Sequence, residues 1–213
     1  MKSNNSKTIE YSPEMRIFDK GGNRLYLNAS EGDRFLEAAK EESRENHVFC
    51  HTLYYTGCRP SEALELSARR IDLVGNFIVF RSLKKRPYDN QGRKKQPSYR
   101  SVDVPTRLID DLTLVFDLRA RNKDGSRRDQ LLWGMSRQSA WRIVKRVMAR
   151  AEIAGPQATS KGLRHAFGVK CVMSGAPLHK IAKWLGHTDS KTTEVYTKVV
   201  DEEEREMLMR VWE

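Results

Sequence analysis

The sequence lacks the features that would place the chain in a membrane or in a secretory pathway. No apolar run approaches the roughly 20 residues needed to cross a bilayer, and the mean hydropathy is −0.68. The first 15 residues contain no apolar segment of the kind found in secretory signals. The three cysteines, Cys50, Cys58 and Cys171, are odd in number and lack zinc-ligand spacing, which argues against disulfides and structural zinc. We therefore expect a soluble, cytoplasmic protein with reduced thiols.

What the chain has in excess is positive charge. It has 213 residues, with 39 Lys and Arg against 28 Asp and Glu, a formal net charge of +11. The acids are concentrated in residues 201–213, so the rest of the chain is more basic still. Two basic stretches, residues 84–100 and 133–170, favour contacts with the phosphates of a polyanion over an ordinary solvated surface. The length is enough for one main core.

The hydrophobic pattern predicts a mainly α protein with a small antiparallel sheet. Residues 1–29 form an extension in which Asp19 to Asn23 indicate a turn, and residues 30–213 form the main domain, with Ser30 as the first helix cap. Two β-rich segments joined by a long basic loop predict a hairpin. Helices and strands are expected over these ranges: strands 77–80 and 101–104, and helices 106–121, 137–153, 160–174 and 178–185.

Several polar residues stand where a periodic helix does not require them. Arg59 lies at a sharp turn, Lys161 and Arg164 are three residues apart, His187 follows a glycine that ends a helix, and Tyr196 comes nine residues later. Each has an ordinary explanation alone: a surface arginine, a helix cap or a core tyrosine. The set is what calls for a chemical explanation.

Together these residues resemble the tyrosine recombinase family, also called the phage integrase family. Residues 56–66, which read TGCRPSEALEL, are similar to the first arginine box of that family. Residues 161–165 (KGLRH) resemble the second box, and residues 185–188 (LGHT) with 192–197 (TTEVYT) resemble the third box and its nucleophile. The resemblance implies the recombinase catalytic-domain fold and DNA cutting and rejoining. The short length resembles the fimbrial phase-variation invertases.

The resemblance assigns a role to each box residue. Tyr196 would attack a DNA phosphodiester and form a 3′-phosphotyrosyl link, while Arg59 and Arg164 would hold its non-bridging oxygens, as planar cationic donors can. His187 and Lys161 would act as supporting donors. Lys84 would protonate the leaving 5′ oxygen, with Lys85 as the alternative. Because the link keeps the bond energy, the reaction needs neither ATP nor a metal, and the chain lacks a phosphate-binding P-loop and an H-E-x-x-H zinc motif.

The expected partner is double-stranded DNA. Helix 137–153 carries three bases on one face, and the loop before residue 101 carries most of the others, so the candidate DNA contacts are Lys85, Arg86, Arg93, Lys94, Lys95, Arg100, Arg142, Lys145 and Arg146. The resemblance also implies a homotetramer on DNA, association with the nucleoid and, because the extension is short, help from an accessory DNA-binding protein. The tail from about residue 198 would pack into a neighbouring protomer or fold back on its own core.

Two departures from the family leave other functions open. The second box usually opens with histidine, whereas this chain has Lys161, which cannot act as a base while protonated. The segment before Ser30 is too short to supply the amino-terminal clamp domain of most relatives, so the chain is either a compact form or a fragment. The alternatives are a helix-turn-helix regulator that binds through residues 178–196 without cleavage, a type IB topoisomerase, and a catalytically inactive accessory recombinase.

Overall fold

The structure is a computed structural model that describes residues 16–82, 91, 93, 96–187 and 191–197. Its described part is mostly helical and contains one three-stranded antiparallel sheet, which confirms the predicted fold class. None of the helices within these ranges is long and apolar enough to span a bilayer.

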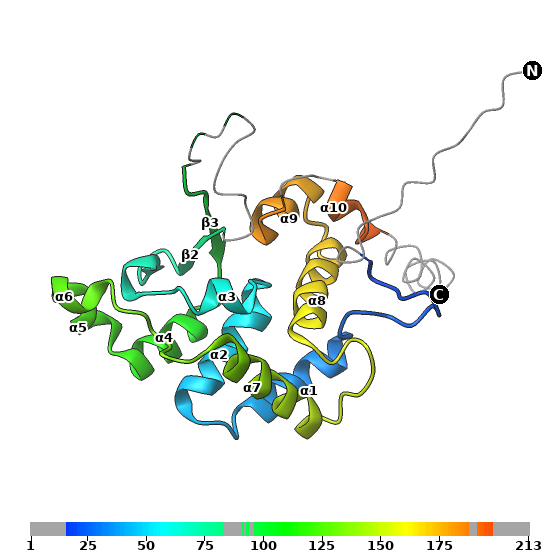
Figure 1. Ribbon diagram of the computed structural model, residues 1–213, viewed down its shortest axis with the longest axis horizontal. Coiled ribbons are helices and arrows are strands. Elements are labelled where there is room, and N and C mark those ends of the chain that lie inside the picture. Colours follow the sequence, from blue (N-terminus) through cyan, green and yellow to red (C-terminus); the bar gives the residue numbers. More distant parts are fainter. Residues whose placement is uncertain (1–15, 83–90, 92, 94–95, 188–190, 198–213) are drawn as a thin grey trace, which may run out of the picture.

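The helices and strands follow one another in an order close to the predicted one (Figure 1). Their bounds are α1 Ala29–Ala39, α2 Arg44–Thr56, α3 Pro60–Ala63, β1 Ile71–Asp72, β2 Phe77–Arg81, β3 Tyr99–Asp103, α4 Thr106–Phe116, α5 Leu118–Lys123, α6 Gly125–Arg128, α7 Arg137–Arg150, α8 Ser160–Met173, α9 Leu178–Leu185 and α10 Lys191–Glu194. A short 3-10 helix, Ala68–Arg70, precedes β1.

The helix ends correct several predicted boundaries. The first helix is capped by Asn28 rather than Ser30, because Asn28 and Glu31 form a reciprocal capping box. Helix α8 begins at Ser160, as predicted, and ends at Met173, and Thr159 accepts its capping hydrogen bond. The predicted helix 106–121 is divided at Asp117, whose left-handed backbone (φ 50°) ends α4 before α5 begins. The helix predicted over 137–153 ends at Arg150.

The small sheet confirms the predicted hairpin and adds a strand. The strand order is β1-β2-β3, and β2 pairs with β3 so that Phe77 faces Asp103 and Phe80 faces Arg100. Ile78, Phe80 and Val102 are buried on one face while their neighbours along each strand are more exposed, as expected for a sheet packed on one side. The two-residue strand β1 is too short for a sequence pattern to indicate.

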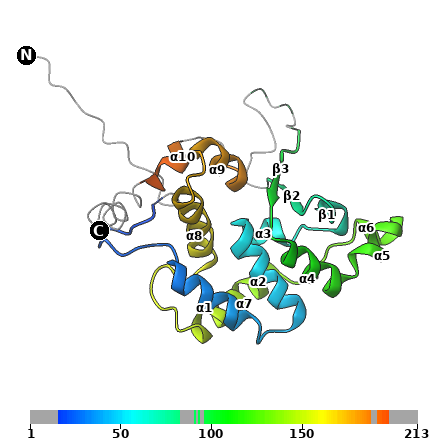
Figure 2. The same ribbon diagram turned by 180° about the vertical axis from the view of Figure 1, so that it is seen from behind.

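Two apolar clusters fill the described part of the molecule. The larger lies among α1, α2, α4, α7 and the sheet. The smaller contains Ile17, Val169, Ile181, Leu185 and Tyr196, from the amino-terminal segment, α8, α9 and the residues that follow α10. In both views α8 runs between the α1, α2 and α7 group and the α9 and α10 pair (Figures 1 and 2). The candidate nucleophile Tyr196 therefore belongs to the cluster built around α8.

Candidate active site

The first box forms a sharp turn that presents Arg59. Helix α2 ends at Gly57, whose left-handed backbone (φ 58°) serves as its cap. A Cβ atom at this position would lie 2.7 Å from the ring of Phe167, so a larger residue would be strained and crowded. Arg59 is then extended and Pro60 opens α3, where its missing N–H costs nothing. The prediction that Arg59 stands at a turn is confirmed.

A buried carboxylate holds Arg59 in place. Glu62 is fully buried and accepts from Arg59 Nη1 at 3.0 Å and from the Arg59 backbone N–H at 2.9 Å. Arg100 Nη2, on β3, donates to the same carboxylate at 2.7 Å, and Arg100 Nε donates to the carbonyl of Trp184. Burial alone would raise the pKa of Glu62, but the hydrogen bond and charge of Arg100 outweigh it and lower that pKa. Glu62 is therefore an ionised bridge between two arginines.

Arg164 ties the three boxes together. It lies on α8, is only 8% exposed, and donates from Nη1 to the carbonyl of Gly57 and from Nη2 to the carbonyl of Leu185, both at 2.6 Å. Burial, followed by the nearby charge of Arg59, lowers the pKa of Arg164 to about 10, so the side chain stays cationic at neutral pH. One guanidinium thus fixes the ends of α2 and α9 relative to α8.

Tyr196 is packed inside the smaller cluster. Its ring is 1% exposed, and its hydroxyl lies 3.1 Å from Nδ1 of His165. The ring fits against Gly168 of α8, where a Cβ atom would come within 2.5 Å of Cζ. Burial raises the pKa of Tyr196 to about 12, although the positive charges of Arg164 and Arg59 act in the opposite direction. The phenol is therefore protonated at neutral pH.

His187 lies beside the tyrosine as a neutral imidazole. It follows the helix cap Gly186, its ring is stacked with that of Tyr196 at 6.4 Å between centroids, and its Nδ1 lies 3.0 Å from Oγ1 of Thr193. Burial, and next the positive charges of Arg164 and Arg59, lower the pKa of His187 to about 3. Thr193 thus orients the ring.

The structure brings four of the six predicted catalytic residues together: Arg59, Arg164, His187 and Tyr196. Arg59 and Arg164 are both close enough to Tyr196 for their charge to lower its pKa against the effect of burial. Lys161 is exposed at the start of α8. Burial is the largest cause that lowers the pKa of His165, and the charge of Lys161 lowers it further. Lys84 lies outside the described residues, as do the predicted DNA contacts Lys85, Arg86, Lys94 and Lys95. The catalytic roles remain predictions.

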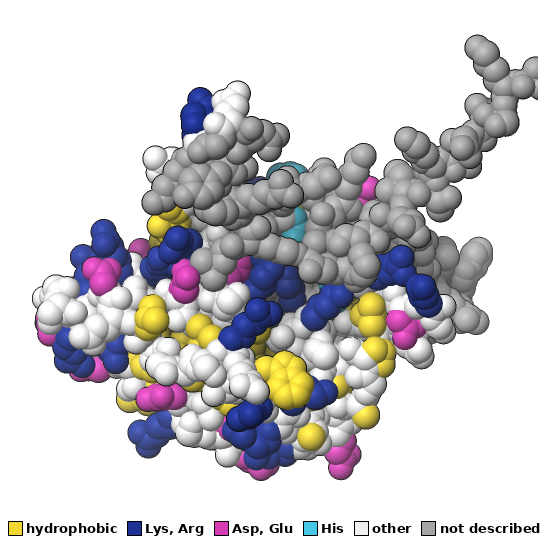
Figure 3. All heavy atoms as spheres, viewed as in Figure 1, with side chains coloured by type: hydrophobic (Ala, Val, Ile, Leu, Met, Phe, Trp, Pro, Cys, Tyr) yellow, Lys and Arg dark blue, Asp and Glu magenta, His cyan; other side chains and the backbone are white. Residues whose placement is uncertain are grey.

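The predicted DNA contacts within the described part of the chain have different environments. Arg93 and Arg142 are exposed. Lys145 donates to the carbonyl of Ala158, and Arg146 pairs with Glu42. Arg100 is 5% exposed and bound to Glu62, so the structure gives it a buried site rather than a surface facing DNA. Basic side chains are spread across the face shown in Figure 3 rather than gathered in one patch.

Three residues near the centre of the site had no catalytic role in the sequence analysis. Glu62 and His165 lie inside the boxes that carry the family resemblance, whereas Arg100 was expected on the DNA surface. The capping position of Glu62, three residues after Arg59, was a usable signal for a helix start. No local signal connects His165 with Tyr196, which is 31 residues away.

Comparison with a protein-family model identifies the family that has these boxes. The model of the phage integrase family matches residues 26–203 of the chain. The chain belongs to the phage integrase family. This match extends over all three boxes and over most of the described fold.

Two relatives agree with the family match. The chain is 28% identical over 182 residues to the tyrosine recombinase XerA of Thermococcus kodakarensis, covering 83% of this chain and 58% of the relative. It is 30% identical over 188 residues to the tyrosine recombinase XerD of Staphylococcus aureus, covering 85% and 60%. The chain thus spans about three fifths of the length of these relatives. The resemblance to fimbrial invertases remains a prediction.

Solved structures of the family have the same fold. A crystal structure of XerA recombinase matches with a TM-score of 0.69 at 26% identity, covering 87% of this chain and 64% of that one. XerH recombinase bound to its difH substrate before cleavage gives a TM-score of 0.67 at 19% identity, covering 92% and 60%. The catalytic domain of bacteriophage HP1 integrase gives 0.57 at 21% identity, covering 82% and 87%. This integrase fold therefore carries the site described above.

The buried histidines predict that mild acid destabilises the fold. Burial is the largest cause that lowers the pKa of His165 and His187 to about 3 and that of His51 to about 4. Below the ordinary value of 6.5 the unfolded chain binds protons that the folded chain does not, so stability is lost as the pH falls from about 6.5 towards about 3. Each histidine contributes up to about 1.4 kcal/mol per pH unit.

This loss should be visible above pH 5, where carboxylates that have a lowered pKa in the folded state are ionised in both states. Urea denaturation at pH 7, 6 and 5.2 should give a free energy of unfolding that falls at each step. His165→Asn should make the fall shallower, whereas His179→Gln, at an exposed position on α9, should leave the slope unchanged. A free energy of unfolding that is constant from pH 7 to pH 5.2 would contradict the prediction.

Proposed function

We propose that the chain is a site-specific DNA recombinase that cuts and rejoins DNA through Tyr196. The observation that carries this proposal is the position of Arg164, which joins the carbonyls of Gly57 and Leu185 and so assembles the three boxes around the tyrosine. Membership of the family, and relatives named as tyrosine recombinases, support the same reaction. The outcome is inversion, excision or integration, according to the placement of the target sites.

In the proposed reaction, the oxygen of Tyr196 attacks a DNA phosphorus atom. The bond from phosphorus to the 5′ oxygen breaks, and a 3′-phosphotyrosyl bond forms. Arg59 and Arg164 stabilise the charge on the non-bridging oxygens, because their donors are held by Glu62 and by backbone carbonyls before substrate arrives. The departing 5′ oxygen takes a proton from Lys84, and attack by a 5′ hydroxyl on the phosphotyrosyl bond rejoins the strand without ATP or a metal.

The proton of the phenol is the difficult part of this step. With a pKa of about 12, Tyr196 needs a proton acceptor or a stronger positive field at neutral pH. The imidazoles of His165 and His187 are both neutral, and the phenolic proton passes to His165, whose Nδ1 is 3.1 Å from the hydroxyl. Because the ring is 1% exposed, the arrival of the phosphate must be accompanied by a movement that opens the pocket. We therefore regard this structure as the DNA-free arrangement.

The proposed substrate is double-stranded DNA, and the proposed assembly is a homotetramer on two duplexes. The net charge of +11 favours binding to phosphates, and XerH, one of the structural neighbours, was solved on a DNA substrate. Arg93, Arg142 and Arg146 are the predicted contacts that are exposed in the described part of the chain, and Arg146 pairs with Glu42 there. An accessory DNA-binding protein, and a place at the nucleoid, complete the proposal.

A suicide substrate tests the reaction. Duplexes with a nick near the cleavage point and randomised flanking sequence trap a covalent intermediate, because the short cleaved product diffuses away. The wild-type chain should give an adduct that resists denaturation by detergent, and Tyr196→Phe should bind the same DNA but give none. Binding without an adduct in the wild-type chain would show a regulator or an inactive recombinase instead. Relaxation of any supercoiled plasmid would indicate a topoisomerase.

A further inference from the structure

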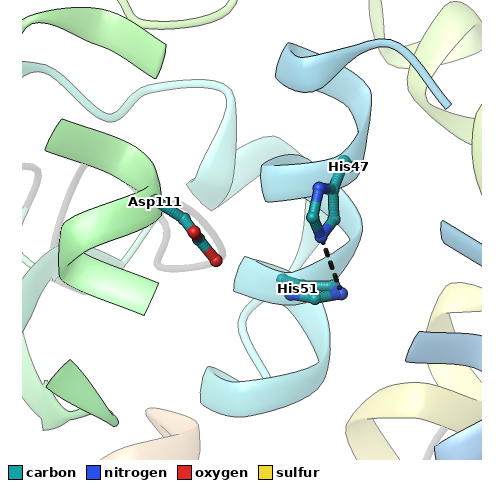
Figure 4. Close-up of side chains that lie close together, drawn as sticks. All are labelled: His47, His51 and Asp111. Atoms are coloured by element: carbon teal, nitrogen blue, oxygen red, sulfur yellow. Dashed lines mark hydrogen bonds between the residues drawn. The ribbon is translucent and has the colours of Figure 1, made fainter. Parts of the chain in front are cut away.

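A cluster of potential metal ligands joins α2 to α4, outside the boxes. His47 and His51 lie one helical turn apart on α2, and Asp111 comes from α4 (Figure 4). One ligand atom from each residue lies within 4.8 Å of the other two. Among the residues that the structure describes, this is the one such group of three. Histidines at i and i+4 share a face of a helix, which is the spacing that helical zinc sites use.

The three ligand atoms are farther apart than those of an occupied site. Two atoms bound at about 2.0–2.1 Å to one tetrahedral Zn²⁺ are separated by about 3.3 Å, whereas these atoms lie within 4.8 Å of one another, so the side chains must turn inward when an ion binds. The Nε2 atoms of His47 and His51, 3.1 Å apart, form a hydrogen bond that an ion at either nitrogen would replace. A carboxylate oxygen completes a set of three protein ligands and leaves the fourth position to water. Because His47 and Asp111 are only partly buried, an ion can reach the site from solvent.

The charges around the cluster decide how strongly it can bind. An imidazole binds an ion through a nitrogen that carries no proton, so binding should be stronger at neutral pH than in acid. The charge of Asp111 favours a cation, while Arg107 and Lys40 oppose it. His51 Nε2 lies 3.2 Å from the carbonyl of Leu36, so this nitrogen can keep its proton and donate there, while Nδ1, which is on the Asp111 side of the ring in Figure 4, is the ligand. These opposing effects favour a moderate affinity.

We propose that His47, His51 and Asp111 bind one divalent transition-metal ion, preferentially Zn²⁺. Imidazole and carboxylate ligands suit Zn²⁺ better than Mg²⁺, which prefers oxygen atoms alone. Neighbouring Cys50 is not part of the set, since it is fully buried on the side of α2 that faces Glu42 and Arg146. The site lies outside the boxes, and the expectation of metal-free chemistry at Tyr196 is independent of it.

The ion would fasten the helix that leads into the first box. Helix α2 ends at Thr56, directly before Gly57, whose carbonyl accepts from Arg164. Fixing α2 against α4 would therefore make the backbone turn before Arg59 more rigid. An ion that binds only the folded chain also stabilises it in proportion to the logarithm of its concentration.

The test uses the untagged full chain and ZnCl₂ alone. Titration calorimetry should find one Zn²⁺ per chain, and thermal unfolding with Zn²⁺ at 100 times its Kd should raise Tm by about 5–10 °C. MgCl₂ at the same concentration should not raise it. Co²⁺ bound in place of Zn²⁺ should give the intense visible absorption of a four-coordinate site.

Two substitutions and their matched controls decide the ligands. His47→Gln and Asp111→Asn should each weaken Zn²⁺ binding by at least about tenfold, while His179→Gln and Asp110→Asn, at exposed positions, should not change it. Neither test variant replaces the buried His51, and Tm without metal checks that each is folded. No binding by the wild-type chain, or equal binding by Asp111→Asn, would overturn the proposed three-residue site.

Discussion

Arg164→Lys is expected to lower the rate of covalent adduct formation by about 1000-fold, the scale of losing a preorganised donor to a developing oxyanion. Lysine keeps the positive charge but has one nitrogen in place of a planar fork. It cannot donate to the carbonyls of Gly57 and Leu185 and also hold a phosphate oxygen, as the guanidinium can. The measurement is single-turnover cleavage of the suicide duplex at saturating protein.

The matched control for this substitution is Arg128→Lys, which makes the same chemical change at an exposed position on α6. It should cleave at the wild-type rate. The affinity of Arg164→Lys for DNA is measured by the electrophoretic shift of an uncleaved duplex. This affinity should fall by a much smaller factor than the cleavage rate, because a single phosphate contact is a small part of the total electrostatic affinity. A cleavage rate within threefold of the wild-type rate would show that Arg164 is a structural residue only.

The sequence predicted which residues lie in the site better than it predicted the residues that hold them in place. The boxes place Arg59, Arg164, His187 and Tyr196 at turns and helix ends, and the structure brings these four together. Glu62 supports Arg59 from three residues away, but other supports come from positions far along the chain. Arg100 reaches Glu62 across 38 residues, so no local period could show that a base in a basic strand is directed inward. Sequence spacing therefore indicates which residues come together, but not what holds most of them.

The fold shows the same division between local and distant causes. The β-rich composition of two segments predicted the hairpin of β2 and β3, and the helical periods predicted most helices, because such a period reflects which side of a helix faces the core. The division of the predicted helix at Asp117 has a cause that the apolar period does not show. A left-handed aspartate ends α4, and the buried Leu118 then starts α5 in a new direction. The apolar spacing continues through this break, which explains why one helix was predicted.

The proposed ligands His47, His51 and Asp111 show why the lack of a zinc motif in a sequence does not exclude a metal site. The cysteines lack zinc-ligand spacing, and the chain has no H-E-x-x-H motif. His47 and His51 nevertheless have the same four-residue separation without the glutamate. Their third partner, Asp111, is 60 residues away on α4, so only the packing of two helices brings the set together. Motif searches find ligands that share one segment, and this group does not.

Gly168→Ala is expected to reduce adduct formation by about 100-fold, the effect of displacing a reacting group by about an ångström. The new Cβ atom would lie 2.5 Å from Cζ of Tyr196 and 2.7 Å from Cε1, closer than such atoms approach in folded proteins. The ring must therefore shift away from α8, and with it the hydroxyl that His165 holds. An alanine within a helix is otherwise favoured over glycine by about 1 kcal/mol.

Because alanine favours the helix, a loss of adduct formation by Gly168→Ala can be attributed to crowding of the Tyr196 ring. Gly125→Ala is the matched control, because Gly125 also lies in a helix and its added Cβ would meet nothing within 4 Å. Gly168→Ala should bind DNA as the wild-type chain does and lose cleavage, since only the position of the phenol changes. If it instead cleaves at the wild-type rate while remaining folded, the buried pose of Tyr196 is not one from which the reaction starts. The nucleophile would then act from an arrangement in which α8 no longer touches its ring.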